Sequence, residues 1–233
     1  MWADVALIVG AYLLGSLPHL FLLGRLCGVD LKGDLHCELW QKGGQLLGTI
    51  GVLGEFAKGA IPVLVGKSLG FDLFIVVLAG LAAVSGQMWP IFSRFEGEKG
   101  NSIGLAMAGA LALEPLFVAL VPIAVAVAVR TLPRLRNSSQ PVSERLTGGP
   151  HSRSLPLGMA IGFLTLPIAS WWLREPLVIT WGYAVLFILI MVRRLTAGLR
   201  GDLAAGVSIR GILVKRLLYD RSYRQAARAS SLG

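Results

Sequence analysis

The chain has 233 residues, of which 55% are hydrophobic and only 15% carry a charge. Soluble domains carry about 25% charged residues, so this composition excludes an ordinary soluble globular domain. The 22 Lys and Arg residues exceed the 13 Asp and Glu residues and give a net charge of +9. They lie between long apolar blocks and not on one polar face, so we expect a membrane protein without a nucleic-acid partner.

Several apolar segments have the length of a membrane span, which is about 20 residues of helix. Three of them contain no charged residue: residues 5–24, 73–93 and 154–173. The first is too long for the core of a signal peptide and follows no basic segment, so we expect it to stay in the mature chain. Two further helices are predicted at residues 45–66 and 176–192, the former in spite of Glu55 and Lys58.

The remaining apolar segment, residues 100–129, is interrupted only by Glu114. As a single helix it would be about 45 Å long, too long for a hydrocarbon core of about 30 Å. Its centre reads Leu113-Glu114-Pro115. Proline disfavours helical geometry in the preceding residue and glutamate is costly in lipid, so the triplet indicates a turn at a surface. This break predicts seven helices, of which the fourth is short or broken.

The distribution of basic residues supports this count through the positive-inside rule. With seven helices and the N-terminus outside, 19 Lys and Arg residues lie on the inner side and only Lys67 and Arg174 on the outer side, whereas six helices give 15 and 6. We therefore predict an all-α integral membrane bundle of seven helices, N-terminus outside and C-terminus cytoplasmic. Residues 1–198 form the membrane domain. Residues 199–233 form a basic cytoplasmic tail that either lies along an anionic leaflet or is solvated.

Polar groups near the inner ends of these helices are the first candidates for function, because they are expensive in a membrane. Residues 15–18 read Gly-Ser-Leu-Pro, and Arg25 and Lys32 follow in the next connection. Proline frees a backbone carbonyl, and the hydroxyl of Ser16 then stabilises either the kink or a substrate.

A second candidate cluster lies within the next helix. Glu55 and Lys58 are three residues apart and share a helix face, so they can neutralise each other and leave the ammonium near a ligand. A purely structural ion pair is the alternative. Gly59 permits close approach of another backbone.

The most specific cluster covers residues 86–102. Gly97 and Gly100 flank Lys99 directly before an apolar helix that begins near Asn101. Backbone N–H groups, a lysine charge and a helix N-terminus together are what a phosphate group requires. Arg193 and Arg194, at the inner end of the last helix, are explained by the topology alone.

In this order the clusters resemble the bacterial acyl-phosphate-dependent glycerol-3-phosphate acyltransferases, the PlsY family of integral membrane enzymes. The resemblance covers about residues 11–198 and is carried by four motifs. The family's G-S-I-P segment, with its following arginine and D-I-R stretch, is similar to residues 15–18, 25 and 30–32. The D-x-x-K-G motif is similar to residues 55–59, and the closing R-L-x-x-G motif is similar to residues 194–198. The longest motif, G-H-x-F-P-V-F-x-x-F-K-G-G-K-G, is similar to residues 86–100.

The sequence also departs from this family pattern. A glycine- and asparagine-rich stretch that binds phosphate in the family is replaced over residues 33–44, where Asp34, His36, Glu38 and Lys42 offer different chemistry. The family's histidine after Gly86 is Gln87, and its second loop glycine is Glu98. The histidine and asparagine expected before Arg194 fall on apolar residues, near Ile188 and Met191.

The resemblance implies a membrane acyltransferase that moves a fatty acyl group from acyl phosphate to glycerol 3-phosphate and gives lysophosphatidic acid, in the bacterial cytoplasmic membrane. It implies no metal and no cofactor, and its partners are these two substrates and membrane lipids. The implied catalytic residues are Ser16, Arg25 and Lys99. The implied substrate-binding residues are Lys32, Lys58, Gly59, Gly97, Gly100, Asn101 and Arg194.

Three points stay open at the level of sequence. The first alternative is a catalytically silent or retargeted member that binds lipid precursors or a partner enzyme, which the missing motif residues favour. The second is a small transporter with Glu55 and Lys58 in its pathway, although no internal repeat is visible. The proton acceptor is either His36 or a substrate phosphate.

Overall fold

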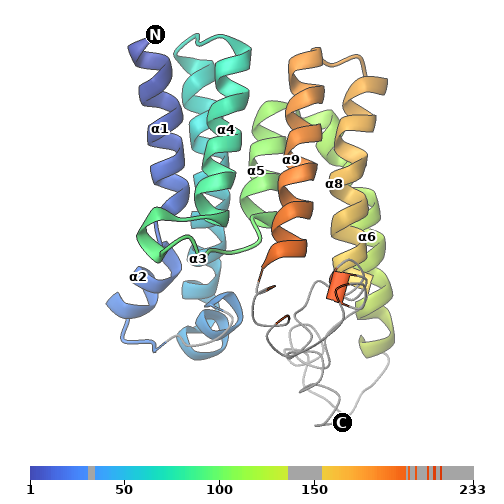
Figure 1. Ribbon diagram of the computed structural model, residues 1–233. Coiled ribbons are helices and arrows are strands. Elements are labelled where there is room, and N and C mark those ends of the chain that lie inside the picture. Colours follow the sequence, from blue (N-terminus) through green and yellow to red (C-terminus); the bar gives the residue numbers. More distant parts are fainter. Residues whose placement is uncertain are drawn as a thin grey trace.

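The computed structural model describes residues 1–30, 35–135 and 154–197, together with the isolated positions 199, 203, 209, 212, 213 and 216. The described part is a bundle of helices that run side by side (Figure 1). In chain order these are α1 (Trp2–Ser16), α2 (His19–Leu26), α3 (Leu35–Ser68), α4 (Leu73–Met88), the short 3-10 helix η1 (Ile91–Ser93), α5 (Asn101–Leu111), α6 (Leu113–Leu135), α8 (Ser154–Trp172) and α9 (Leu177–Thr196). No strand occurs among the described residues, so the all-α prediction is confirmed.

The helices have the lengths and compositions of membrane spans. Five of them, α3, α4, α6, α8 and α9, are long and apolar enough to cross a bilayer. Helices α1 and α2 pass the same test as a pair that is bent by 48°, and α5 is a shorter apolar helix. With 11 residues, α5 is only about 16 Å long, as expected for the short fourth element.

Two of the helix breaks lie at or next to the positions that proline predicts. Helix α1 ends at Ser16 and α2 begins at His19, so the break falls on Leu17 and Pro18. Helices α5 and α6 are separated by Ala112 alone, which has an extended backbone, one residue before the predicted Leu-Glu-Pro turn. Within α3 the backbone leaves helical geometry at Gly44, where φ is 86° and ψ is 171°. Glycine tolerates this combination because it has no Cβ.

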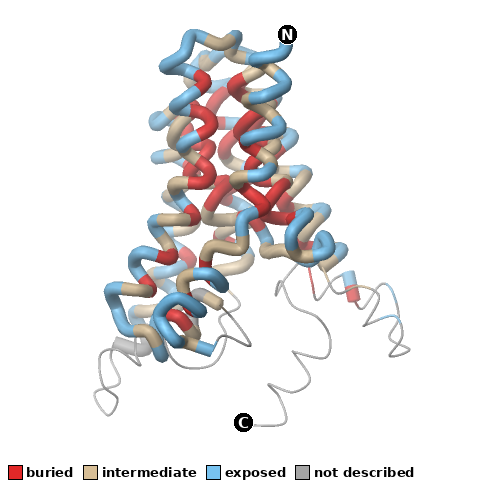
Figure 2. Tube along the Cα trace, turned by 90° about the vertical axis from the view of Figure 1, so that its left-hand side faces the viewer, coloured by how far each residue is buried: buried red, intermediate tan, exposed pale blue. Residues whose placement is uncertain are grey.

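Helix α4 lies at the centre of the bundle and packs against α1, α3, α5 and α9. The apolar stretch of α4 that could cross a membrane is 61% buried, a larger share than in any other long helix described. Figure 2 shows the buried residues gathered on the inner sides of the helices, with exposed residues on the outside. Many of the exposed residues are large and hydrophobic, among them Val9, Leu53, Val121 and Ile168, as a lipid environment requires.

Glycines bring α1 and α4 into backbone contact. A Cβ on Gly15 would lie 2.0 Å from the carbonyl oxygen of Ala83, and one on Gly86 would lie 2.2 Å from that of Tyr12. Small residues allow this close approach between membrane helices. As a result, the C-terminal end of α1, with Ser16, lies directly against the C-terminal end of α4.

Candidate functional site

Ser16 is the last residue of α1 and is only 1% exposed. Its hydroxyl oxygen lies 2.8 Å from the carbonyl oxygen of Tyr12 in its own helix and 3.2 Å from that of Gly86 on α4. These two acceptors share one hydroxyl hydrogen, and the lone pairs of the hydroxyl oxygen remain to accept a hydrogen bond from a third group. The structure thus places Ser16 at the contact between two helix ends.

Lys58 on α3 extends to the same place and is 7% exposed. Its Nζ donates hydrogen bonds to the carbonyl oxygens of Gly15, at 3.2 Å, and Leu17, at 3.1 Å. The helix break causes this arrangement, because the amide of His19 bonds to Leu17 and does not continue the α1 ladder to Gly15. A cation is favourable at a helix C-terminus, so Lys58 stabilises the bend beside Ser16.

Gly59 follows Lys58 and lies at the contact between α3 and α5. A Cβ at this position would be 2.2 Å from the carbonyl oxygen of Ile103. The sequence expectation of a close backbone approach at Gly59 is therefore confirmed, and the approaching backbone belongs to α5.

The connection from α4 to α5, residues 89–100, is held from two sides. The hydroxyl of Tyr12 on α1 donates to the carbonyl oxygen of Trp89 at 2.7 Å. From α9, Arg193 donates to the carbonyl oxygens of Gly97, at 2.5 Å, and Glu98, at 3.3 Å. The guanidinium carbon of Arg193 also lies 6.0 Å from the ring centroid of Trp89, within the range of a cation–π contact.

Both loop glycines are required by the local geometry. A Cβ on Gly97 would lie 2.0 Å from the backbone oxygen of Gln87, so the loop passes directly over the end of α4. Gly100 has a φ of 74° and precedes Asn101, the first residue of α5. Lys99 stands exposed between them, next to the N-terminus of α5. Such an N-terminus favours an anion through its free N–H groups and dipole.

Gln87 joins the loop to the helices beneath it and is only 5% exposed. Its Nε2 donates to Oε1 of Glu55 on α3, at 2.5 Å, and to Oε2 of Glu98 in the loop, at 3.2 Å. Glu55 is itself 2% exposed. The amide group of Gln87 thus donates each of its two hydrogens to a carboxylate. These two hydrogen bonds connect α4 to α3 and to the loop.

Two further predicted site residues are Arg25 on α2 and Arg194 on α9. Arg25 is exposed in the last turn of α2. Arg194 is buried and donates to the carbonyl oxygens of Pro156, at 2.7 Å, and Arg216, at 3.0 Å. The guanidinium of Arg216 in turn donates to the carbonyl oxygens of Leu195 and Ala197. Arg194 thus connects the end of α9 to the start of α8 and to one position of the tail.

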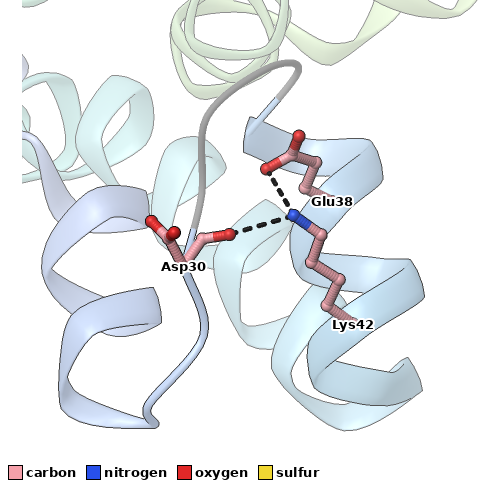
Figure 3. A network of polar contacts seen from close by, with 3 residues as sticks. All are labelled: Asp30, Glu38 and Lys42. Atoms are coloured by element: carbon pink, nitrogen blue, oxygen red, sulfur yellow. Dashed lines mark hydrogen bonds and ion pairs between the residues drawn. The ribbon is translucent and has the colours of Figure 1, made fainter.

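Asp30, Glu38 and Lys42 form a separate polar network near the start of α3 (Figure 3). Lys42, in the first part of α3, donates to Oε2 of Glu38 at 3.2 Å and to the backbone oxygen of Asp30, after α2, at 3.0 Å. Lys32 and Asp34 lie outside the described residues, as does most of the predicted tail. In the part of the chain that is described, no three His, Cys, Asp or Glu side chains gather as a metal site requires.

Sequence reasoning did not assign the residues that hold the loop. Tyr12 carried no signal, because a tyrosine in an apolar helix is common. The sequence explains Arg193 by topology alone, and Gln87 and Glu98 stand out in it only as departures from a motif. Their roles depend on contacts between helices that are distant in sequence, up to 96 residues for Arg193 and Gly97.

Comparison with known proteins identifies the family. The sequence profile of the family described as glycerol-3-phosphate acyltransferase matches residues 5–199. The chain belongs to this family. It is a membrane acyltransferase, as the order of its motifs predicts.

Individual relatives agree with this assignment. Glycerol-3-phosphate acyltransferase 4 of Dehalococcoides mccartyi (strain CBDB1) is 29% identical over 230 residues, which cover 94% of this chain and 89% of the relative. The glycerol-3-phosphate acyltransferase of Geobacter metallireducens is 37% identical over 123 residues, 51% of this chain and 62% of that protein.

Solved structures show the same fold. The crystal structure of PlsY (YgiH), an integral membrane glycerol 3-phosphate acyltransferase, in its lysophosphatidic acid form, has a TM-score of 0.65 and 22% identity. The likeness covers 91% of this chain and 99% of that one. The glycerol 3-phosphate form of PlsY gives the same score over 88% of this chain and 93% of that one.

Proposed function

We propose that this acyltransferase moves a fatty acyl group from acyl phosphate to the primary hydroxyl of glycerol 3-phosphate, at the inner face of a bacterial cytoplasmic membrane. The observation that carries the proposal is the position of Ser16. It is buried at the contact of α1 and α4, and the glycine-flanked Lys99 belongs to the loop that crosses the same end of α4.

The proposed reaction needs no covalent intermediate on the protein. The hydroxyl oxygen of glycerol 3-phosphate forms an ester bond with the acyl carbonyl carbon, and the bond from this carbon to the phosphate oxygen breaks. The hydroxyl proton leaves on the released inorganic phosphate. The protein then has two tasks, which are alignment of the nucleophile and neutralisation of phosphate charge.

We assign these tasks to the predicted site residues as follows. Ser16 orients the reacting groups, while Arg25 and Lys99 supply exposed positive charge for the two phosphates. Gly97, Gly100 and Asn101 bring backbone N–H groups at the start of α5 to the acyl phosphate. Lys32, outside the described residues, is a further phosphate ligand.

Three other predicted binding residues also hold the helices in position. They are Lys58, Gly59 and Arg194. The hydrogen bonds given above for Lys58 and Arg194 go to backbone carbonyl oxygens, and Gly59 packs against α5. An ammonium has three hydrogens, so Lys58 retains one for a substrate oxygen beside Ser16. Arg194 contributes to substrate binding through the positions of α8 and α9.

The orientation in the membrane is part of the proposal. If α1 and α2 count as one bent span and α5 as a short one, the chain passes through the bundle seven times. The beginning of α1 and the end of α9 then lie at opposite ends, in agreement with the arrangement in Figure 1. The positive-inside rule supports Arg25, Lys99 and Arg193 on the inner side and Lys67 on the outer side.

The test uses purified protein with palmitoyl phosphate and glycerol 3-phosphate, and follows phosphate release and lysophosphatidic acid together. We expect both products in equal amounts, and turnover at least about tenfold lower in Ser16→Ala and Lys99→Ala, since each removes a group that acts on the transition state.

Two matched variants at the opposite end of the bundle control for general damage to the protein. Ser68 is exposed at the end of α3, and Lys67 caps the end of α5. We expect Ser68→Ala and Lys67→Ala to keep wild-type turnover per folded protein. Absence of turnover in the wild type, with other acyl phosphates and acceptors also tried, would contradict the proposed reaction and favour a lipid-binding role.

A further inference from the structure

The side chain of Gln87 has one polar atom that the fold leaves unused. Its Nε2 donates to Glu55 and Glu98, but its Oε1 is buried and has no hydrogen-bond partner among the described residues. The opposite orientation of the amide would place Oε1 against two carboxylate oxygens, so the contacts fix Oε1 as the free acceptor. Buried acceptors are nearly always paired, which indicates that a donor binds here.

This free acceptor lies beside the groups assigned to the reaction. The preceding residue, Gly86, accepts the hydrogen bond of Ser16, and the backbone oxygen of Gln87 accepts the amide of Glu98. Gln87 therefore lies between the buried serine and the loop that carries Lys99. A ligand held by both Ser16 and Lys99 would extend along this residue.

The chemistry of an amide oxygen limits what the donor can be. Phosphate oxygens at neutral pH are mainly acceptors, so the charged end of a substrate does not fit this atom. A hydroxyl group does fit. An amide is a very weak base, so it suits a hydroxyl that keeps its proton and not the one that is acylated.

We propose that Oε1 of Gln87 accepts a hydrogen bond from the secondary hydroxyl of glycerol 3-phosphate and thereby directs the primary hydroxyl to the acyl donor. The inference rests on the proposed function and adds a specificity-determining residue to it. Glu55 and Glu98 hold the amide in place, so that Oε1 points in one direction. The same contact discriminates against acceptors without a secondary hydroxyl.

The test compares two acceptors, glycerol 3-phosphate and 3-hydroxypropyl phosphate, which lacks only the secondary hydroxyl. Values of kcat/KM are measured for the wild type and for Gln87→Met, which keeps the side-chain size, in the presence of EDTA to exclude a bound divalent cation. We expect the wild type to prefer glycerol 3-phosphate by about tenfold or more, as for one lost hydrogen bond, and Gln87→Met to lose most of this preference.

Glu98→Gln is the matched control, because an amide oxygen at this position still accepts from Nε2 of Gln87 and leaves Oε1 free. We expect this variant to retain the preference for glycerol 3-phosphate, whatever its overall rate. An equal loss with both acceptors in Gln87→Met would overturn the inference and show that Gln87 only holds the loop.

Failure of the proposed function is recognised separately. If the wild type shows no turnover, equilibrium binding of the two acceptors in the absence of an acyl donor decides the inference. Tighter binding of glycerol 3-phosphate that is lost in Gln87→Met supports it, and equal binding of both compounds to the wild type rejects it.

Discussion

At the scale of single residues, Lys58 shows how a buried charge acts on the backbone. Its ammonium supplies hydrogen bonds to two carbonyl oxygens at the bend between α1 and α2. We expect Lys58→Met to lower the free energy of unfolding by about 3 kcal/mol, because it removes both hydrogen bonds, leaves the buried carbonyl oxygen of Gly15 without this donor, and takes away a cation three residues from Glu55. Thermal unfolding of the protein in detergent, followed by tryptophan fluorescence, measures this loss.

Lys67 provides the matched comparison for Lys58. It also donates two hydrogen bonds to a helix end, to the carbonyl oxygens of Ala110 and Leu111, but it is exposed. Water or lipid headgroups can replace it, so Lys67→Met is expected to cost under about 1 kcal/mol. Similar losses in both variants would show that burial of the ammonium is not what makes Lys58 important.

At the residue scale, the sequence predicts local features but not contacts between distant segments. Glycines 97 and 100 could be predicted as a close-approach loop because their chemistry is local. The partners of Lys58 and Arg194 could not, since the carbonyl oxygens that they bind belong to other segments, 38 to 43 residues away in the case of Pro156 and Gly15. Only Pro18 signals that such carbonyls exist.

At the scale of elements, Arg193 makes the α4–α5 loop depend on the position of α9. Removing the guanidinium by Arg193→Gln breaks the contacts to the carbonyl oxygens of Gly97 and Glu98. We expect amide hydrogen exchange at residues 94–99 to become about tenfold faster and turnover to fall, because the loop is less well positioned. Arg174→Gln, in the connection between α8 and α9, is the control and should leave loop exchange unchanged. Unaltered exchange in Arg193→Gln would mean that other contacts fix the loop.

The helix breaks were predictable at this scale, and the first part of α3 was not. Pro18 and the Leu113–Pro115 triplet act on adjacent residues, so their effects can be read from the sequence to within one residue. Residues 35–43 contain His36, Glu38, Gln41 and Lys42 and precede the apolar segment predicted at residues 45–66, yet they form helix before the kink at Gly44. Their network of Asp30, Glu38 and Lys42 stabilises a helix that composition alone did not indicate.

At the scale of the whole molecule, the central position of α4 relates the fold to the function. It contacts α1, α3, α5 and α9, so each helix that contributes a predicted site residue, apart from α2, is positioned against it. The site groups lie at the end of α4 where the glycine contacts to α1 occur. The charge distribution along the sequence favours the proposal that this end faces the inner side, where glycerol 3-phosphate would reach it.

This orientation predicts the accessibility of two positions at opposite ends of the bundle. Cys27 is exposed just after α2, and Ser68 is exposed at the end of α3. In spheroplasts, a membrane-impermeant maleimide should label the Ser68→Cys variant of a protein that also carries Cys27→Ser and Cys37→Ser. It should not label a Cys37→Ser protein, in which Cys27 alone remains, until the membrane is lysed. Lysed spheroplasts, where both proteins react, control for intrinsic reactivity. Labelling of Cys27 in intact spheroplasts would place the predicted active site on the outer face, away from cytoplasmic glycerol 3-phosphate, and would contradict the topology on which the assignment of Arg25 and Lys99 depends.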